Sequence, residues 1–438
     1  MNYTFRQVHI LMCSFCLLVA ASSCSVNKQI SRKASKLLLQ DSAVRQGHIG
    51  ISIYEPATGK YWYEHDAEKY FTPASNTKLF TLYAGMKYLG DSLVGLKYLE
   101  TSDTIFFEGT GDPTLLHPDF VAQPVLSFLA NSHKDKVFRV NSKDNFDALG
   151  SGWAWNDFES SYMAERSALP VFGNIATFWL KNGQLKSTPA SFAENLYMVI
   201  PADGKFSMHR QQDANKFSLS ADNTTFTSQE IPFKTGGSAT ALNQISDSIG
   251  GIALLQVLPG LQNATKLFSQ PADSLFKPMM HRSDNFFAEQ TLLMASNTVL
   301  GYMNESALID SLLKTDLKDL QQKPRWVDGS GLSRYNLFTP QSFVYILNKM
   351  KNDFGWERMQ NILATGGEGT LSSYYKTEQG FIYAKTGTLS NNCALSGYLT
   401  TKKNKLLVFS VLANHYQTTA TPVRRAVEKF LKGLRERY

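Results

Sequence analysis

The chain has 438 residues, of which 43% are hydrophobic and 18% are charged, with a formal net charge of +7. This composition is typical of a globular protein and excludes long disordered or low-complexity segments. A single hydrophobic core seldom organises so many residues, so we expect two or more folding units, or one domain with a large insertion. The basic residues are spread along the chain without clustered aromatic residues, so we expect no nucleic acid partner.

Residues 1–23 have the pattern of a secretory signal. One early cation, Arg6, precedes an apolar run, and small residues precede Cys24. The run is shorter than the roughly 20 residues that span a membrane, so we expect this segment to be removed on export to the periplasm. Ala21-Ser22-Ser23-Cys24 also resembles a bacterial lipoprotein cleavage box, although leucine is usual where Ala21 stands. A lipid anchor at Cys24, which would attach the protein to the membrane, and plain cleavage are therefore alternatives.

The cysteines and the charge of the exported chain follow from this cleavage. Cys13, Cys16 and Cys24 lie in or next to the signal, which leaves Cys393 as the only ordinary thiol and permits no internal disulfide. Loss of Arg6 lowers the formal charge from +7 to +6. This mild basic excess suits an anionic wall or membrane surface, and a merely solubilising surface equally well.

Residues 49–64 are expected to form a β-hairpin. β-branched and aromatic residues occupy positions 49–54 and 61–64, and a Pro-Ala-Thr-Gly turn separates them. A helix is expected after Pro73, because apolar residues recur at helical spacing and Gly90 suits its end. These apolar positions are Leu79, Leu82, Tyr83, Met86 and Leu89.

Ser75 and Lys78 form an S-x-x-K pair where this helix begins. A spacing of three places both side chains on one helical face, where the amine can touch the hydroxyl. A serine hydroxyl is a poor nucleophile until a base removes its proton. Lysine can be that base when burial or a second cation lowers its pKa. The pair alone is a weak signal, because a helix cap followed by a solvated lysine has the same pattern.

Between residues 96 and 269 short strand-like runs alternate with Gly, Pro, Asn and Ser, without long helical periodicity. We interpret this stretch as a β-rich inserted region, large enough for two small subdomains. After it, Ser283-Asp284-Asn285 precedes another helix with an apolar stripe. Ser283 or Asp284 can cap that helix. In a compatible chemical interpretation, Ser283 relays a proton between two lysines and on to a leaving amine, while the Asn285 amide binds a substrate carbonyl.

Three strand-like runs, residues 381–388, 394–400 and 405–413, are expected to be consecutive antiparallel strands. A last helix follows, with an apolar stripe that should pack on the sheet. Membrane docking through its basic face is the alternative. The stripe comprises Val423, Ala426, Val427, Phe430, Leu431 and Leu434, and the basic residues placed outside it are Arg424, Arg425, Lys429, Lys432 and Arg435.

The first of these strands contains Lys385-Thr386-Gly387. On a strand, Lys385 and Gly387 point to one face, and Thr386 and Thr388 to the other. Lys385 supplies a cation that attracts a carboxylate, and Gly387 lets a ligand backbone lie against the strand. The Thr388 N–H can form an oxyanion hole together with that of Ser75.

The same tripeptide also occurs at Lys234-Thr235-Gly236. This copy precedes Ser283, follows Pro232 and leads into another glycine, so we interpret it as a turn.

In chain order, Ser75-x-x-Lys78, Ser283-x-Asn285 and Lys385-Thr386-Gly387 match the motif set of penicillin-binding proteins and class A β-lactamases. Further stretches extend the likeness over nearly the whole exported chain, namely TGDPTL at 110–115, WAWNDF at 153–158, DGSGLSR at 328–334, GGEGTL at 366–371 and AKTGTL at 384–389. With them the sequence resembles the D-alanyl-D-alanine carboxypeptidase/endopeptidase family of low-molecular-mass (class C) penicillin-binding proteins.

The resemblance implies an α+β fold, namely a penicillin-binding/serine β-lactamase-like transpeptidase domain with an antiparallel sheet, flanking helices and a helical subdomain. It also implies that an insertion splits this catalytic domain, which would comprise residues 24–95 and 270–438 around the inserted region at 96–269. A carboxylate in the insertion and an arginine in DGSGLSR would bind the diaminopimelate-type side chain of the substrate. By motif position these are Asp157 and Arg334.

The implied function is serine-type D-Ala-D-Ala carboxypeptidase or DD-endopeptidase activity on peptidoglycan stem peptides, through an acyl-enzyme on Ser75 that penicillin also forms. The catalytic residues would be Ser75, Lys78 and Ser283. The substrate-binding residues would be Asn285, Lys385, Thr386, Gly387, Thr388, Asp157 and Arg334. We expect no metal and no cofactor, because the sequence lacks H-E-x-x-H, C-x-x-C and a complete dinucleotide loop.

Two other functions compete with this one. A β-lactamase shares the three motifs but needs a positioned base for fast deacylation, and no E-x-x-L-N run lies between Asn285 and Lys385. A non-catalytic wall-binding or β-lactam-sensing module would be expected to lose the nucleophile or its lysine, yet every motif position is intact. Turnover of a D-Ala-D-Ala pentapeptide separates the three.

Overall fold

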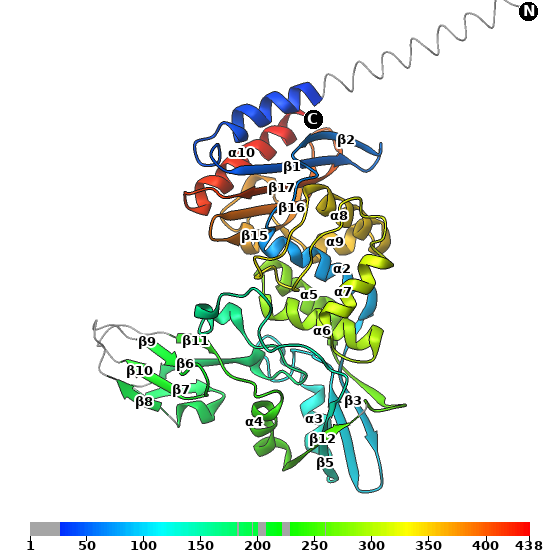
Figure 1. The fold of residues 1–438 in the computed structure, drawn as a ribbon, viewed down its shortest axis with the longest axis vertical. Helices are drawn as coiled ribbons and strands as arrows, with labels where there is room; N and C mark the ends of the chain where they lie inside the picture. Colours follow the sequence, from blue (N-terminus) through cyan, green and yellow to red (C-terminus); the bar gives the residue numbers. More distant parts are fainter. Residues whose placement is uncertain (1–26, 182–183, 195, 200–206, 221–227, 259) are drawn as a thin grey trace, which may run out of the picture. The chain divides into compact units, whose positions relative to one another are not determined.

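The structure is a computed structural model that describes residues 27–181, 184–194, 196–199, 207–220, 228–258 and 260–438 (Figure 1). The predicted signal segment and Cys24 lie outside the described residues. The chain forms two compact units: the first contains the residues up to Asn76 with Leu320–Arg325 and Asn336–Tyr438, and the second contains Thr77–Asp319 and Trp326–Tyr335. Within the described ranges, no helix combines the length and apolar character that crossing a membrane requires.

A six-stranded antiparallel sheet is the centre of the first unit (Figure 1). The predicted hairpin and the three consecutive C-terminal strands are confirmed. Pairing of β1 with β17 joins the two ends of the chain in one sheet. The strand order is β14 (Ala364–Thr365), β15 (Ile382–Leu389), β16 (Asn392–Thr400), β17 (Leu406–Asn414), β1 (His48–Glu55) and β2 (Lys60–His65).

Helices cover both faces of this sheet. Alternate residues of β1 (Ile49, Ile51 and Ile53) are buried in one core with the apolar stripe of α10 (Ala420–Arg437), as predicted. Gly50 points to the other face, where an added Cβ would lie 2.7 Å from Pro340 at the start of α8 (Pro340–Phe354). Further helical elements of this unit include residues 27–34, η1 (Ser35–Leu39), most of η2 (Ala74–Thr77), α9 (Trp356–Ile362), η7 (Gly369–Leu371) and η8 (Lys376–Glu378).

The prediction that every basic residue of α10 lies outside its apolar stripe was wrong for Arg435. Arg435 is buried, and its guanidinium carbon lies 4.0 Å from the centre of the Phe381 ring. Arg435 follows Leu431 by four residues, so it falls on the packed face of the helix. A guanidinium can be buried there because the aromatic ring attracts the cation.

Helices α2 (Lys78–Tyr88), α5 (Ala272–His281), α6 (Asn285–Leu300) and α7 (Glu305–Lys314) belong to the second unit. The predicted helix after Pro73 is confirmed as α2. It packs closely on its neighbours, because a Cβ on Gly85 would lie 2.7 Å from both Phe276 and Thr291. Helix α6 is capped by Asp284, whose carboxylate accepts the Phe287 N–H at 3.0 Å, as one of the two predicted caps.

Three further sheets lie between residues 92 and 271 of the second unit. The five-stranded sheet has the order β12 (Ile252–Leu258), β5 (Asp135–Asn141), β4 (Thr104–Gly109), β3 (Ser92–Glu100) and β13 (Thr265–Pro271). One three-stranded sheet has the order β11 (Ser228–Pro232), β6 (Ile175–Lys181) and β7 (Gln184–Thr188). The other has the order β8 (Leu196–Val199), β10 (Phe217–Ser220) and β9 (Ser207–Arg210). Buried phenylalanines from all three sheets, among them Phe107, Phe178 and Phe217, form one core. The connections between the strands of these sheets contain four short 3-10 helices, η3 (Trp155–Asp157), η4 (Ser161–Met163), η5 (Phe172–Asn174) and η6 (Ala190–Ala193).

The stretch was expected to lack long helical periodicity, and it contains two short helices that the sequence did not predict, α3 (Pro124–Asn131) and α4 (Ala239–Ile249). The buried residues of α4 include Leu242, Ile245 and Ile249, whose spacing is helical. That stripe was visible in the sequence, but it is short and stands beside Gly236-Gly237 and Gly250-Gly251, which favour turns.

Candidate active site

The predicted site residues fall into two groups, because the chain passes from the first unit to the second between Asn76 and Thr77. The first unit contains Ser75 and the strand segment Lys385-Thr386-Gly387-Thr388. The second unit contains Lys78, Ser283, Asn285, Asp157 and Arg334.

In the first unit, strand β15 lies against the backbone of the Ser75 turn. Ser75 is half-buried in η2. A Cβ on Gly387 would lie 2.6 Å from the Pro73 carbonyl oxygen, 3.1 Å from the Ser75 nitrogen and 3.0 Å from the Asn76 nitrogen. Distances below 3.0 Å leave no room for a side chain, so only glycine permits this approach. The sequence predicted that this glycine makes room for a ligand. The structure adds that it makes room for the turn that contains Ser75, the predicted nucleophile.

The threonines of β15 alternate with Gly387 as predicted. The Thr386 hydroxyl donates to Thr370 Oγ1 at 2.8 Å, and Thr370 belongs to the GGEGTL stretch. Thr388 Oγ1 accepts a hydrogen bond from Arg424 of α10 at 2.5 Å. Lys385 is fully buried, and its Nζ donates to the Thr386 carbonyl at 2.7 Å.

Asn76 was not among the predicted site residues, although it follows the nucleophile directly. Its side-chain Nδ2 donates to Ser396 Oγ of β16 at 2.7 Å, and that hydroxyl donates to Ser410 Oγ of β17 at 2.8 Å. All three side chains are buried. Asn76 therefore ties the Ser75 turn to the middle of the sheet, a role that depends on contacts distant in sequence.

In the second unit, Lys78 is a buried amine with two acceptors. Its Nζ donates to Asn285 Oδ1 and to the Ser330 carbonyl, each at 2.7 Å. Burial lowers the pKa of Lys78 to about 8, although the carboxylates of Asp328, Glu289 and Asp284 oppose this by raising it. Desolvation penalises the charged form of an amine, which is the condition that a lysine base requires.

Asn285 was predicted to bind the substrate, and in the structure its amide bridges two parts of the protein. The oxygen accepts from Lys78, and the Nδ2 group donates to the Tyr162 carbonyl of η4 at 3.0 Å. Ser283, two residues earlier, has a φ of 63°, a backbone conformation that is uncommon for serine. The catalytic role of Ser283 and the substrate contact of Asn285 stay predictions.

A cavity of about 620 Å³ adjoins this motif within the second unit. Ser283 and Asn285 line it together with Tyr162 and three residues of β6, namely Ile175, Thr177 and Trp179. Cavities of roughly 300–1,000 Å³ hold small-molecule and peptide groups. The segment Ser283-Asp284-Asn285 therefore lines a space large enough to receive part of a ligand.

The two residues assigned to side-chain recognition both belong to the second unit. Asp157 is half-buried at the end of η3, and burial raises the pKa of Tyr162 with a contribution from the Asp157 carboxylate. Arg334 is exposed near the end of the 326–335 segment. Their shared role stays a prediction.

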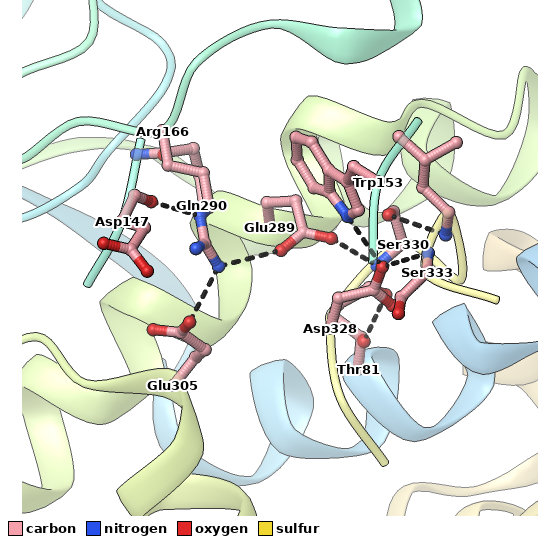
Figure 2. A network of polar contacts seen from close by, with 12 residues as sticks. Thr81, Asp147, Trp153, Arg166, Glu289, Gln290, Glu305, Asp328, Ser330 and Ser333 are labelled. Atoms are coloured by element: carbon pink, nitrogen blue, oxygen red, sulfur yellow. Dashed lines mark hydrogen bonds and ion pairs between the residues drawn. The ribbon is translucent and has the colours of Figure 1, made fainter. Parts of the chain in front are cut away.

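The DGSGLSR stretch forms a loop that closes on its own aspartate (Figure 2). The Asp328 carboxylate accepts the backbone N–H groups of Gly331 at 2.9 Å and Ser333 at 2.6 Å. It also accepts the indole N–H of Trp153 at 3.0 Å, so the WAWNDF and DGSGLSR stretches meet in the fold. The Ser330 N–H donates to Glu289 Oε1 at 2.7 Å.

Glu289 and its partner Arg166 were missed in the sequence. Neither residue belongs to a motif. The available signal was the position of Glu289 inside the apolar run NFFAEQTLLMAS, because a charge on a buried helix needs a partner. The partner itself, 123 residues away, could not be named from the sequence.

The second Lys-Thr-Gly copy forms a turn before α4, as predicted. Gly236 and Gly237 have φ values of 56° and 74°. The Lys234 amine pairs with Glu165 at 3.3 Å, and the Thr235 N–H and hydroxyl donate to the same carboxylate. In the part of the chain that the structure describes, no cluster of three or more His, Cys, Asp or Glu residues could hold a metal ion.

The sequence model of the D-Ala-D-Ala carboxypeptidase 3 (S13) family matches residues 31–228 and 248–434. The chain belongs to this family. The predicted family is thereby confirmed, and with it the expected enzyme class, a peptidase of the D-Ala-D-Ala carboxypeptidase type.

Relatives within the family are similar over most of their length. The chain is 26% identical to the D-alanyl-D-alanine carboxypeptidase of Actinomadura sp. (strain R39) over 442 residues, covering 87% of this chain and 80% of that protein. It is 25% identical to the D-alanyl-D-alanine carboxypeptidase DacB of Haemophilus influenzae, covering 81% and 83%.

Solved structures confirm the predicted fold class. The crystal structure of penicillin binding protein 4 (dacB) from Haemophilus influenzae superposes with a TM-score of 0.74 at 20% identity, covering 93% of this chain and 99% of that one. A structure of the same protein with a β-lactam has a TM-score of 0.68 at 18% identity, with the same coverage. The Bd0816 endopeptidase of Bdellovibrio bacteriovorus, in complex with an immunity protein, has a TM-score of 0.52 at 16% identity, covering 89% and 94%.

We expect Gly387→Ala to abolish most acylation by penicillin, because the new Cβ would push the Ser75 and Asn76 backbone away from β15. A displacement of about 1 Å in a catalytic group can cost roughly 100-fold in rate, and a time course with labelled penicillin measures it. The matched control is Gly251→Ala, since a Cβ on Gly251 has no atom within 4 Å. Acylation of Gly387→Ala at the parent rate would show that this close approach is not needed.

Proposed function

We propose that the protein is a serine-type DD-peptidase that acts on peptidoglycan stem peptides through an acyl-enzyme on Ser75. It would act as a D-Ala-D-Ala carboxypeptidase, as a DD-endopeptidase, or as both. The main support is the buried Lys78 amine, whose pKa is lowered to about 8. At pH 7 such an amine is neutral in about 9% of molecules, against about 0.03% at a pKa of 10.5. It can therefore accept a proton near neutral pH.

The proposed acylation begins at the carbonyl of the penultimate D-alanine. Ser75 Oγ attacks that carbon while neutral Lys78 takes the hydroxyl proton. The N–H groups of Ser75 and Thr388 stabilise the negative charge that develops on the carbonyl oxygen. The C–N bond then breaks, and the leaving amine receives a proton that Ser283 relays. Water finally hydrolyses the ester and restores the Ser75 hydroxyl.

The remaining predicted residues would hold the substrate. Lys385, fully buried in β15, would attract the terminal carboxylate, and Thr386 and Gly387 would lie along the peptide. Asn285 would bind a peptide carbonyl, while Asp157 and Arg334 would bind the diaminopimelate-type side chain. A β-lactam presents a reactive carbonyl to the same serine, and the complex of the Haemophilus influenzae protein with a β-lactam supports this inhibitor class.

A β-lactamase is the main enzymatic alternative, and one observation weighs against it. Fast deacylation needs a carboxylate that is available to activate water. Glu289, whose charge acts on Lys78, is 1% exposed, and its two oxygens already face the Ser330 N–H and Arg166. A glutamate engaged in this way is poorly suited to activate water.

Export and domain division are also inferred from the sequence. Residues 1–23 would direct the protein to the periplasm, and the mass of the mature protein would distinguish a lipid on Cys24 from plain cleavage. Residues 96–269 would form the insertion within the catalytic domain, whose two parts are 24–95 and 270–438.

The parent protein should release D-alanine from a D-Ala-D-Ala pentapeptide, and Ser75→Ala should reduce this release to background, because no nucleophile remains. Ser102→Ala changes an exposed serine and should behave like the parent. Many turnovers of a β-lactam without D-alanine release would instead identify a β-lactamase. One equivalent of bound penicillin with neither turnover would identify a sensing module.

The two Lys-Thr-Gly copies allow a matched comparison of lysines. Lys385→Ala should lower both D-alanine release and penicillin acylation by at least about 100-fold, because a preorganised charge is lost. Lys234→Ala removes only a partly exposed ion pair with Glu165, so both rates should stay at the parent level, with at most about 1 kcal/mol lost from the free energy of unfolding. Equal losses in the two variants would mean that the inserted region contributes to catalysis.

A further inference from the structure

A buried row of polar contacts runs from the Lys78 amine to Ser330 and on through Glu289 and Arg166 to Glu305 of α7. Figure 2 shows the part of this row from Ser330 to Glu305. Lys78 Nζ donates to the Ser330 carbonyl, and the Ser330 N–H donates to Glu289 Oε1, each at 2.7 Å. Arg166 Nη1 lies 3.4 Å from Glu289 Oε2 and 2.9 Å from Glu305 Oε1. All of these residues belong to the second unit.

The ion pair at the centre of this row is fully enclosed. The Glu289 side chain is 1% exposed and the Arg166 side chain 2%. Arg166 is held by a further contact, because its Nε donates to the Asp147 carbonyl at 2.9 Å. Desolvating two charges costs several kcal/mol for each ion, which their attraction offsets only with good geometry and additional hydrogen bonds. Two apolar residues could be buried here without this desolvation free energy. We therefore look for a specific role of the two charges.

Ser330 is the residue on which these contacts converge. Its N–H faces Glu289 and its carbonyl faces Lys78, so the orientation of one residue links the carboxylate to the amine. The loop around it is fixed at a second point on α2, where the Thr81 hydroxyl donates to the Gly329 carbonyl at 2.6 Å. With the Gly329 carbonyl held by Thr81, the hydrogen bond from the Ser330 N–H to Glu289 limits how the Ser330 backbone can rotate.

We propose that Glu289, held in place by Arg166, is a positioning residue: it fixes the Ser330 backbone so that the Ser330 carbonyl holds the Lys78 amine in place. This role rests on the proposed function, in which Lys78 is the base that activates Ser75. Glu289 does not touch the reacting atoms and acts only through Ser330 and through its charge.

The charge of Glu289 makes the role measurable. The Lys78 amine is influenced by the carboxylates of Asp328, Glu289 and Asp284, and each of them raises its pKa against the effect of burial. Glu289 is itself influenced by Asp328 and Arg166, and burial raises its pKa to about 7. Glu289→Gln removes one negative charge, so the neutral form of Lys78 is favoured and its pKa falls. The replacement amide also turns an NH2 group toward Arg166 or Ser330, which loosens the Ser330 backbone.

The test is the pH dependence of penicillin acylation in the full-length protein. In the parent, the rate should rise with pH, be half-maximal near pH 8, where half of the Lys78 amines are neutral, and level off about one to two pH units higher. In Glu289→Gln this rise should move to lower pH by about one unit, and the plateau rate should fall at least about 10-fold. Glu289→Asp keeps the charge, so its rise should stay at the parent pH while the plateau falls.

The matched control is Glu305→Gln, because Glu305 contacts the same Arg166 nitrogen, Nη1, and is not a partner of the Ser330 N–H, which donates to Glu289. Its rise should coincide with that of the parent. A parent protein that penicillin does not acylate would refute the proposed function. A parent that is acylated, with Glu289→Gln rising at the same pH or Glu305→Gln shifting as far, would overturn the positioning role alone. If Glu289→Gln does not fold, the double variant Arg166→Met/Glu289→Gln avoids placing the glutamine NH2 group against the Arg166 guanidinium, since both are donors. If the acylation rate of this double variant rises at the parent pH, the positioning role is likewise overturned.

Discussion

The burial of the Lys78 amine is the constraint on which the rest of the site depends. An amine without solvent needs acceptors, and the fold supplies Asn285 at the first turn of α6 and the Ser330 carbonyl from a distant loop. Burial is the largest effect on this amine and lowers its pKa to about 8, although the carboxylates of Asp328, Glu289 and Asp284 raise it. Three elements of the second unit are thereby arranged around one nitrogen atom, and the lowered pKa is the property that the proposed role of Lys78 as a base requires.

The first unit meets a different requirement, which is a close approach between two backbone segments. Gly387 lets β15 touch the turn that carries Ser75, and Asn76 ties the same turn to β16 through Ser396. The six-stranded sheet, with helices on both faces, gives this turn a rigid base. Backbone N–H groups positioned in advance stabilise a developing oxyanion without reorganisation. In the proposed mechanism, Gly387 and Asn76 would therefore contribute by fixing the position of the Ser75 backbone.

The sequence predicted those features that depend on local pattern. The hairpin, the helix after Pro73, the C-terminal strands and the order of the three motifs are all expressed in short periodicities or fixed spacings. Contacts between residues far apart in sequence could not be predicted, so Arg166, Glu289 and the sheet anchor at Asn76 were missed. Arg435 was misplaced because a charged residue on an apolar stripe is normally solvated, and only its ring contact with Phe381 permits burial. Helix α4 was missed because flanking glycines obscured a short stripe.

The central claim is that Ser75 is the nucleophile that forms the acyl-enzyme. Locating the covalent adduct of penicillin tests this claim most directly. The protein would be incubated with penicillin and digested, and the modified peptide would be sequenced by mass spectrometry. We expect one penicilloyl group for each chain, on the peptide that contains Ser75. An adduct on Ser283 or on any other residue, or no adduct at all, would contradict the assignment.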